Sequence, residues 1–103
     1  MNGGHGYDFV WDPAKAKQNL QKHGVSFERA ASVFLDPNAL TVFDTEHSGD
    51  EDRWITLGVD KQGVTLVVCH TFREMDEQTA SVRIITSRKA TKIERKQYEH
   101  RKP

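Results

Sequence analysis

Four apolar segments follow one another closely in the second half of the chain. They read LTVFD from residue 40, RWITLGV from residue 53, VTLVVCHTF from residue 64 and SVRIITS from residue 81. Their β-branched and aromatic residues are typical of strands. The segments between them are too short for a crossover helix, which parallel neighbours would need. The spacing therefore predicts a four-stranded antiparallel meander.

A helix is expected before this meander, because its start and stop signals are both strong. Asp12 can cap the free N–H groups, and Pro13 loses no hydrogen bond at the first helical position. Gly24 tolerates the left-handed backbone that ends many helices. We predict a helix from Pro13 to about Lys22. Its weak apolar stripe consists of Ala14, Ala16 and Leu20.

Two further helices and a first strand complete the pattern. Ser26 is a favourable N-cap for a helix whose apolar residues recur at the helical period. These residues are Phe27, Ala30, Ala31 and Phe34. The segment from Thr91 to His100 predicts a C-terminal helix, in which Thr91 and Glu94 form a capping box. The alternating segment Tyr7–Trp11 predicts a strand.

This order predicts an α+β fold, with one domain over residues 1–103 and a flexible segment over residues 1–6. The N-terminal strand is expected to join the four-stranded meander in a small antiparallel sheet. The two N-terminal helices and the C-terminal helix pack on that sheet. No apolar run is long enough to span a bilayer, and the first residues do not resemble a secretory signal. We therefore expect a cytoplasmic protein that does not bind a membrane.

Metal and cofactor sites are poorly supported. The five histidines are scattered and form no zinc-ligand spacing, either with each other or with the single cysteine. No P-loop, dinucleotide-binding glycine motif or GxSxG elbow is present. Cys69 is alone, which excludes an internal disulfide and fits a reducing compartment, and its apolar neighbours favour a buried thiol. We expect neither a metal nor another cofactor.

The net charge of zero hides an uneven distribution. Residues 83–103 contain eight basic and two acidic side chains, a formal charge of +6, so the preceding residues carry −6. A basic end of this kind can bind phosphates. A solvated helix face is the other explanation, and for basic runs in general it is the commoner one.

Strict alternation places Arg83 on one face of the last predicted strand. The other face carries Val82, Ile84 and Thr86. An arginine within a sheet is costly unless it is paired, for example with a glutamate, or faces a wet groove. Several cations and an imidazole around a groove would suit metal-free RNA cleavage. In that reaction a base removes the 2′-OH proton, an acid protonates the leaving oxygen, and arginines neutralise the phosphoryl charge.

The combined pattern is more specific than these separate features. It comprises FVWDPAKAKQNLQKHGVSFERAASVFLDP, RWITLG, LVVCHTF and VRIITSRKATKIERKQYE. From Phe9 to Glu99 the chain resembles the BrnT family, toxins of bacterial type II toxin–antitoxin systems. Two small departures from the family pattern, at Thr86 and Ser87, replace no charged group.

The resemblance implies a RelE-like fold and a metal-independent endoribonuclease that stops translation by cutting RNA. It also implies a ribbon-helix-helix, BrnA-like antitoxin that sequesters the toxin. Operator DNA would then be bound indirectly, through the complex that represses its own operon.

The resemblance also suggests roles for individual residues. Arg53, Arg83 and Arg88 match basic positions of the family and would bind phosphate and stabilise the transition state. His23 or His70 would transfer protons. The other candidates for RNA binding are Lys22, Lys89, Lys92, Arg95 and Tyr98.

Plainer explanations stand beside these roles. His70 can be a strand-end histidine bonded to backbone, Tyr98 and both tryptophans can be core residues, and His23 can serve the end of its helix. The whole chain can also be a non-catalytic nucleic-acid-binding module or an interaction subunit of an antitoxin complex. Salt-sensitive binding without cleavage products would identify the binding module.

Overall fold

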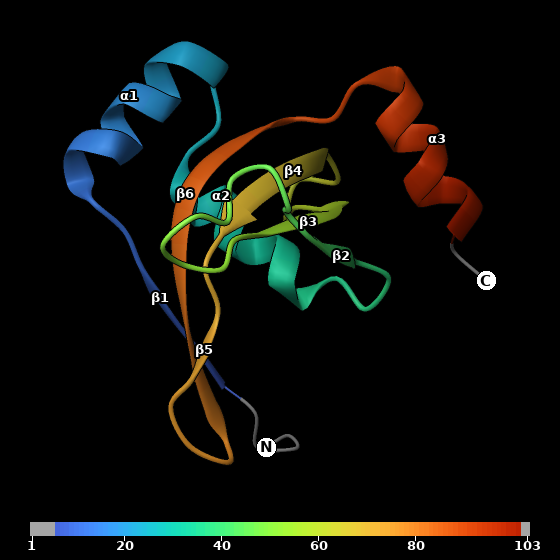
Figure 1. Cartoon of the computed structure of the whole chain (residues 1–103). Coiled ribbons are helices and arrows are strands. Elements are labelled where there is room, and N and C mark those ends of the chain that lie inside the picture. Colours follow the sequence, from blue (N-terminus) through green and yellow to red (C-terminus); the bar gives the residue numbers. More distant parts are fainter. Residues whose placement is uncertain (1–5, 102–103) are drawn as a thin grey trace.

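The computed structural model describes residues 6–101, and for Arg101 the backbone alone. The expected flexible segment 1–6 lies outside this range except for Gly6, which opens the first strand and donates its N–H to the Gln78 carbonyl at 2.7 Å. The elements, in chain order, are β1 (Gly6–Val10), α1 (Pro13–His23), α2 (Phe27–Ser32), the 3-10 helix η1 (Val33–Leu35), β2 (Leu40–Phe43), β3 (Trp54–Val59), β4 (Thr65–His70), β5 (Arg73–Glu74), β6 (Thr79–Lys89) and α3 (Lys92–Arg101). The predicted α+β class is confirmed, and the short strand β5 is an addition to the predicted elements (Figure 1).

The strands form one mixed sheet in the order β1-β6-β4-β3-β2, with β5 also on β6. The predicted antiparallel meander is confirmed for β2, β3, β4 and β6. The prediction of a wholly antiparallel sheet is wrong for β1, which pairs in parallel with β6. All the other elements up to β5 lie between β1 and β6 in the chain, so no hairpin forces an antiparallel pairing. β6 pairs with β4 along its C-terminal half and with β1 and β5 along its N-terminal half, which extends as an arm (Figure 1).

A β-bulge in β6 changes which side chains face the core. Cys69 of β4 pairs with Thr86, but the next residue, His70, pairs with Ile84, so Ile85 is an extra residue in β6. Ile84 is consequently buried, whereas Thr86 is exposed. The predicted strict alternation, which placed Thr86 on the face of Ile84, is therefore wrong beyond Ile84.

One hydrophobic core lies between the sheet and the α2–η1 segment. Its buried residues are Val25, Phe27, Ala30, Val33, Leu66, Val68, Val82 and Ile84. The predicted apolar face of α2 is confirmed, because Phe27 and Ala30 are buried and Ala31 and Phe34 pack against them. Ser26 caps α2 as predicted, accepting the Arg29 N–H at 3.2 Å.

A second, smaller core lies on the opposite face of the sheet, under α3. There Tyr98 packs with Leu57 and Val67. Val67 faces this core, while its neighbours Leu66 and Val68 face the first core, as side-chain alternation along β4 requires. The sheet is therefore covered by helices on both faces.

The ends of α1 follow the prediction, but its buried face does not. Asp12 accepts the Ala14 N–H at 2.9 Å, and Gly24 ends the helix with φ of 70°. The predicted apolar stripe is wrong: Leu20 is 51% exposed and Ala14 is exposed, while Ala16 alone packs against the core. α1 is therefore not held on the sheet by an apolar stripe.

Asn19 attaches α1 to the sheet instead. Its side-chain amide donates to the Ser87 carbonyl at 2.8 Å and to the Val25 carbonyl at 3.0 Å, and its carbonyl accepts the Ser87 N–H at 3.1 Å. These bonds satisfy backbone groups of β6 beyond its pairing with β1, where the strand edge would otherwise be open. Asn19 is 6% exposed, so one buried amide sets the position of the last turn of α1 over β6.

An ion pair attaches α2 to the turn between β3 and β4. Arg29 donates through Nε to Asp60 at 2.7 Å, and the Asp60 side chain is fully buried. Burial would raise the pKa of Asp60, but the Val64 N–H, the Arg29 guanidinium and the Gln62 N–H outweigh it and lower the pKa. Arg29 therefore has a structural role, as half of an ion pair that attaches α2 to the turn.

Candidate functional site

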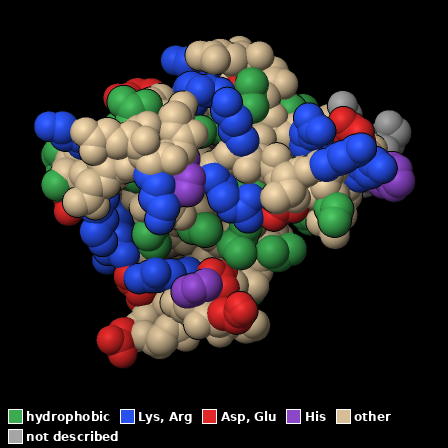
Figure 2. Space-filling model, turned by 90° about the horizontal axis from the view of Figure 1, so that it is seen from above, with side chains coloured by type: hydrophobic (Ala, Val, Ile, Leu, Met, Phe, Trp, Pro, Cys, Tyr) green, Lys and Arg blue, Asp and Glu red, His purple; other side chains and the backbone are tan. Residues whose placement is uncertain are grey.

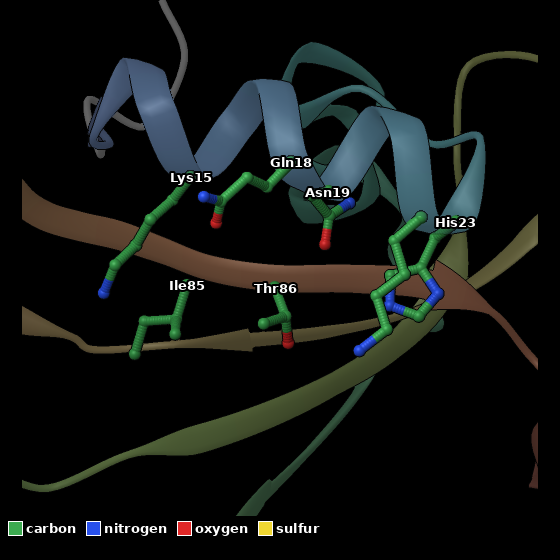
Figure 3. Close-up of a pocket in the computed structure, with 7 residues that line it drawn as sticks. Lys15, Gln18, Asn19, His23, Ile85 and Thr86 are labelled. Carbon is green, nitrogen blue, oxygen red and sulfur yellow. The ribbon is translucent and has the colours of Figure 1, made fainter.

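A hollow of about 270 Å³ opens between α1 and β6. It is lined by Lys15, Gln18, Asn19, Lys22, His23, Ile85 and Thr86. Figure 3 shows the labelled side chains of α1 reaching toward the strand that carries Ile85 and Thr86. The bulge described above turns Thr86 out of the core and into this space. We call it the α1–β6 hollow; it combines two ammonium groups, an imidazole and a hydroxyl.

His23 lies in this hollow with its ring unengaged. Among residues 6–101, neither ring nitrogen of His23 has a hydrogen-bond partner, and neither Lys15 nor Lys22 forms an ion pair. His23 is half-buried and Lys22 is exposed. Both belong to the last turn of α1, where a cation interacts favourably with the helix dipole. His23 thus serves the helix end and remains available for chemistry.

Arg53 and Arg83 lie elsewhere, around the loop that joins β2 and β3. Arg83 donates to Glu51, and both side chains are 46% exposed, so the expected arginine–glutamate pair is present, with its acid in a loop rather than a strand. Arg53 lines a hollow of about 440 Å³ with His47, Gly49, Asp50 and Glu51. Its Nε is buried without a hydrogen-bond partner in the described part of the chain. Glu51 thus pairs with Arg83 and lines the same hollow as Arg53.

The same loop contains a histidine that sequence reasoning missed. His47 Nδ1 lies 2.8 Å from an oxygen of Asp44, whose carboxylate is nearly buried while the imidazole is 65% exposed. A buried carboxylate that orients an exposed imidazole is an arrangement used for proton transfer. The sequence signal was the three-residue spacing of Asp44 and His47 in a polar loop, which alone indicates no more than a turn.

Arg88 is bound to the start of α3. Its two Nη atoms donate to the two carboxylate oxygens of Glu94 at 2.8 and 2.9 Å, which raises the pKa of Arg88 and holds the pKa of Glu94 at about 2. Glu94 also accepts the Thr91 N–H at 2.8 Å, and Thr91 accepts the Glu94 N–H at 3.2 Å, which confirms the predicted capping box. Arg88 is thus part of a helix-capping network.

His70 is buried rather than exposed to solvent. It is 2% exposed, and burial lowers its pKa. Its Nδ1 lies 3.0 Å from the Thr71 carbonyl, which can only accept, so Nδ1 carries the proton; its Nε2 lies 2.7 Å from the Thr56 hydroxyl. Both ring nitrogens therefore have partners, which agrees with the plainer explanation of a strand-end histidine bonded to backbone.

Tyr98, the candidate for base stacking, lies in the second core, as its plainer explanation expects. It is 2% exposed, and its hydroxyl donates to Asp36. Burial and this carboxylate raise the pKa of Tyr98 to about 12. Of the two tryptophans, Trp11 packs against the first core, whereas Trp54 is half-buried and lines an open hollow.

The remaining predicted RNA contacts are exposed on the surface. They are Lys89 at the end of β6 and Lys92 and Arg95 on α3. Figure 2 shows Lys and Arg side chains spread across one face of the molecule, with histidine side chains among them. Within residues 6–101, no three His, Cys, Asp or Glu side chains lie together as a metal site, and no helix is long and apolar enough to cross a membrane.

Residues 11–94 match the family model described as a ribonuclease toxin, BrnT, of a type II toxin–antitoxin system. The chain belongs to the BrnT family. BrnT proteins are ribonuclease toxins of type II toxin–antitoxin systems, so membership implies RNA as the substrate and an antitoxin as a partner. The resemblance seen in the sequence is confirmed.

A solved BrnT structure has the same fold. It is the crystal structure of the Brucella abortus ribonuclease toxin BrnT, which is 22% identical to this chain and superposes with a TM-score of 0.57. The match covers 82% of this chain and 96% of that chain. No curated protein matches this chain.

Proposed function

We propose that this chain is a metal-independent endoribonuclease that inhibits translation, with the α1–β6 hollow as its reactive site. One observation carries the proposal: His23, Lys15 and Lys22 share one hollow, and in the described part of the chain none of them is neutralised by an acid. Membership of the BrnT family supports RNA as the substrate.

The proposed reaction is an attack of the RNA 2′-oxygen on the adjacent phosphorus. His23 removes the 2′-OH proton while the new P–O2′ bond forms and the bond from phosphorus to the 5′-oxygen breaks. Lys22 gives a proton to the leaving 5′-oxygen, and Lys15 neutralises charge on the phosphoryl oxygens. The products are a 2′,3′-cyclic phosphate and a free 5′-hydroxyl. An imidazole suits the first step because one ring nitrogen of its neutral form can accept a proton.

Other cations are assigned to neighbouring phosphates of the same RNA. Arg83 lies on β6, the strand that also lines the α1–β6 hollow, and Arg53 lines a hollow together with Glu51, the partner of Arg83. An exposed ion pair contributes little free energy, so a phosphate can replace Glu51 as the partner of Arg83 at a small cost in free energy. Arg88 is left out of the reactive group because its two Nη atoms are already committed to Glu94.

The partner assignments extend the family description in the same way. The single domain is cytoplasmic, and a ribbon-helix-helix antitoxin neutralises it and brings the complex to operator DNA. The exposed Lys89, Lys92 and Arg95 are assigned to outer contacts with RNA. Co-expression with the protein encoded by the adjacent reading frame tests this part: a stable complex that binds operator DNA is expected.

The catalytic proposal is tested with purified protein and single-stranded RNA in EDTA. Wild type is expected to cut the RNA and leave 2′,3′-cyclic phosphate ends, and His23→Gln is expected to leave it intact. A requirement for added Mg²⁺, or products without cyclic phosphate, would contradict the mechanism. Salt-sensitive binding without any products would favour the non-catalytic binding module instead.

A further inference from the structure

A second hollow lies beside the arginines and is walled by aromatic rings. Its volume is about 300 Å³, and it is lined by Tyr7, Phe34, Thr41, Trp54, His70 and Phe72. A mostly apolar space of this size with a few polar groups is typical of a small-molecule site. We propose that this aromatic hollow binds one unstacked nucleobase of the RNA, an inference that rests on the proposed ribonuclease function.

Most of the rings that line the hollow are held in place by contacts with neighbouring rings. The Phe34 ring lies 5.6 Å from the Tyr7 ring and 4.9 Å from the His70 ring, and Trp54 has the Phe43 ring against it edge-on at 5.0 Å. His70 is also fixed by hydrogen bonds at both nitrogens, of which Nδ1 donates and Nε2 accepts. Walls fixed in advance lose little conformational entropy when a flat ring enters between them. Proteins that bind single-stranded RNA stack its bases on aromatic side chains in this way.

A cation lies next to these walls, which favours a nucleotide as the occupant. Phe72 also lines the adjoining hollow of about 420 Å³, together with Arg73 and Arg83. Two acids, Glu51 and Asp52, line that hollow too, and Glu51 pairs with Arg83. Arg73 forms no ion pair with an acid among residues 6–101. A nucleotide whose base lies in the aromatic hollow can thus place its phosphate beside Arg73, whereas an apolar peptide would offer the Arg73 guanidinium no anionic partner.

The hydroxyl of Thr41 gives the hollow a polar preference. His70 carries its proton on Nδ1, so in the neutral ring Nε2 accepts from Thr56, and Thr56 in turn accepts from Thr41 at 2.8 Å. The Thr41 hydroxyl therefore donates its proton to Thr56, and its oxygen keeps a lone pair that can accept a hydrogen bond from a molecule in the hollow. That oxygen favours bases that present an N–H group to it.

Trp54 reports occupancy of the hollow directly. The chain has two tryptophans, so Trp11→Phe leaves Trp54 as the single indole. Short 2′-O-methyl oligonucleotides of each of the four bases are titrated, because they carry bases but lack the reactive 2′-OH. Binding is expected to quench Trp54 emission, whereas inorganic polyphosphate, which carries charge without bases, leaves it unchanged. The matched Trp54→Phe variant, with Trp11 alone, is expected to show no quenching.

Three substitutions separate the outcomes. Phe72→Leu is expected to weaken oligonucleotide binding about tenfold, Thr41→Val to narrow the differences among the four bases, and Ile93→Ala, an exposed apolar residue on α3, to change neither. Equal quenching by polyphosphate, or unchanged binding by Phe72→Leu while RNA is still cut, would overturn the base site and leave the ribonuclease proposal standing. Quenching without RNA cleavage would support the base site and overturn the ribonuclease proposal. Loss of antitoxin binding alone in Phe72→Leu would assign the hollow to the antitoxin and overturn the inference.

Discussion

Two basic regions of this molecule use their charges differently. At the start of α3, Arg88 is held by both oxygens of Glu94. In the α1–β6 hollow, Lys15, Lys22 and His23 have no acidic partner among residues 6–101. An arginine held by a bidentate pair must lose that partner before it can bind a phosphate, whereas an unpaired cation loses only water. The bidentate pair to a helix-capping glutamate, rather than the number of basic residues, thus distinguishes the structural network from the proposed phosphate site.

The two regions also differ in what holds them. The α3 network serves the fold, since Glu94 both caps the helix and orients Arg88. The α1–β6 hollow is held by an uncharged group, the buried amide of Asn19. Its cations are therefore not needed to keep α1 in place, and their removal should affect RNA chemistry more than stability.

The largest expected effect comes from His23. His23→Gln is expected to reduce RNA cleavage about 10²- to 10⁴-fold, because a general base is lost. The free energy of unfolding should change by no more than about 1 kcal/mol, the size of a helix-dipole contribution. Initial cleavage rates and urea denaturation measure the two quantities. If His47→Gln abolished cleavage and His23→Gln did not, proton transfer would belong to the β2–β3 loop.

Asn19→Ala should act on stability first. The change removes three hydrogen bonds and leaves backbone groups of Ser87 and Val25 without partners, which should lower the free energy of unfolding by about 2–4 kcal/mol. Urea denaturation measures this decrease. A decrease below about 0.5 kcal/mol, the size of an ordinary surface substitution, would show that α1 is held by something other than this amide.

The salt dependence of RNA binding compares the two basic regions directly. The double variant Lys15→Ala/Lys22→Ala should reduce the slope of log K against log salt by about 0.7 for each phosphate that the protein no longer binds. The control Arg88→Gln/Glu94→Gln removes both members of the α3 pair and leaves the net charge unchanged, so its slope should equal that of wild type. An equally reduced slope in both variants would contradict the proposed difference between the α1–β6 hollow and the start of α3.

The smallest effect concerns Glu94 and acid pH. The Arg88 guanidinium lowers the pKa of Glu94 from 4.5 to about 2, so the pair stabilises the fold above pH 4.5, and this contribution is lost as the pH falls through about 2. Because both side chains are partly exposed, Glu94→Gln should cost about 1 kcal/mol at neutral pH. The difference in unfolding free energy between wild type and variant should shrink between pH 4.5 and 2. A difference that grew over this range would contradict the assignment.

Local signals in the sequence predicted the element ends well. Asp12, Gly24, Ser26 and the Thr91–Glu94 box each cap a helix as expected, because a cap depends on a few neighbouring residues. Short loops likewise predicted the antiparallel meander. The parallel pairing of β1 could not be predicted in this way, since it depends on which sheet edge remains free after the other strands have paired.

The candidate site was harder to predict for the same reason. Family resemblance directed attention to His23, Arg83 and Arg88, but no local pattern indicates that Arg83 faces Glu51 or that His70 is enclosed. The bulge at Ile85 reverses the expected direction of Thr86, and strict alternation cannot anticipate it. Lys15, which lines the same hollow as His23, lies two turns away from it on α1 and had no signal of its own.

The central claim is that the α1–β6 hollow, with His23 and its two unpaired lysines, carries the RNA chemistry, and that the paired arginine of α3 does not. It is tested most directly by single-turnover cleavage of one RNA in EDTA by His23→Gln and by Arg88→Gln/Glu94→Gln. The account predicts a rate at least about 100-fold below wild type for His23→Gln and a rate within about twofold of wild type for the double variant. A double variant that fails to cut RNA while folded, beside a His23→Gln protein that cuts it normally, would contradict the account.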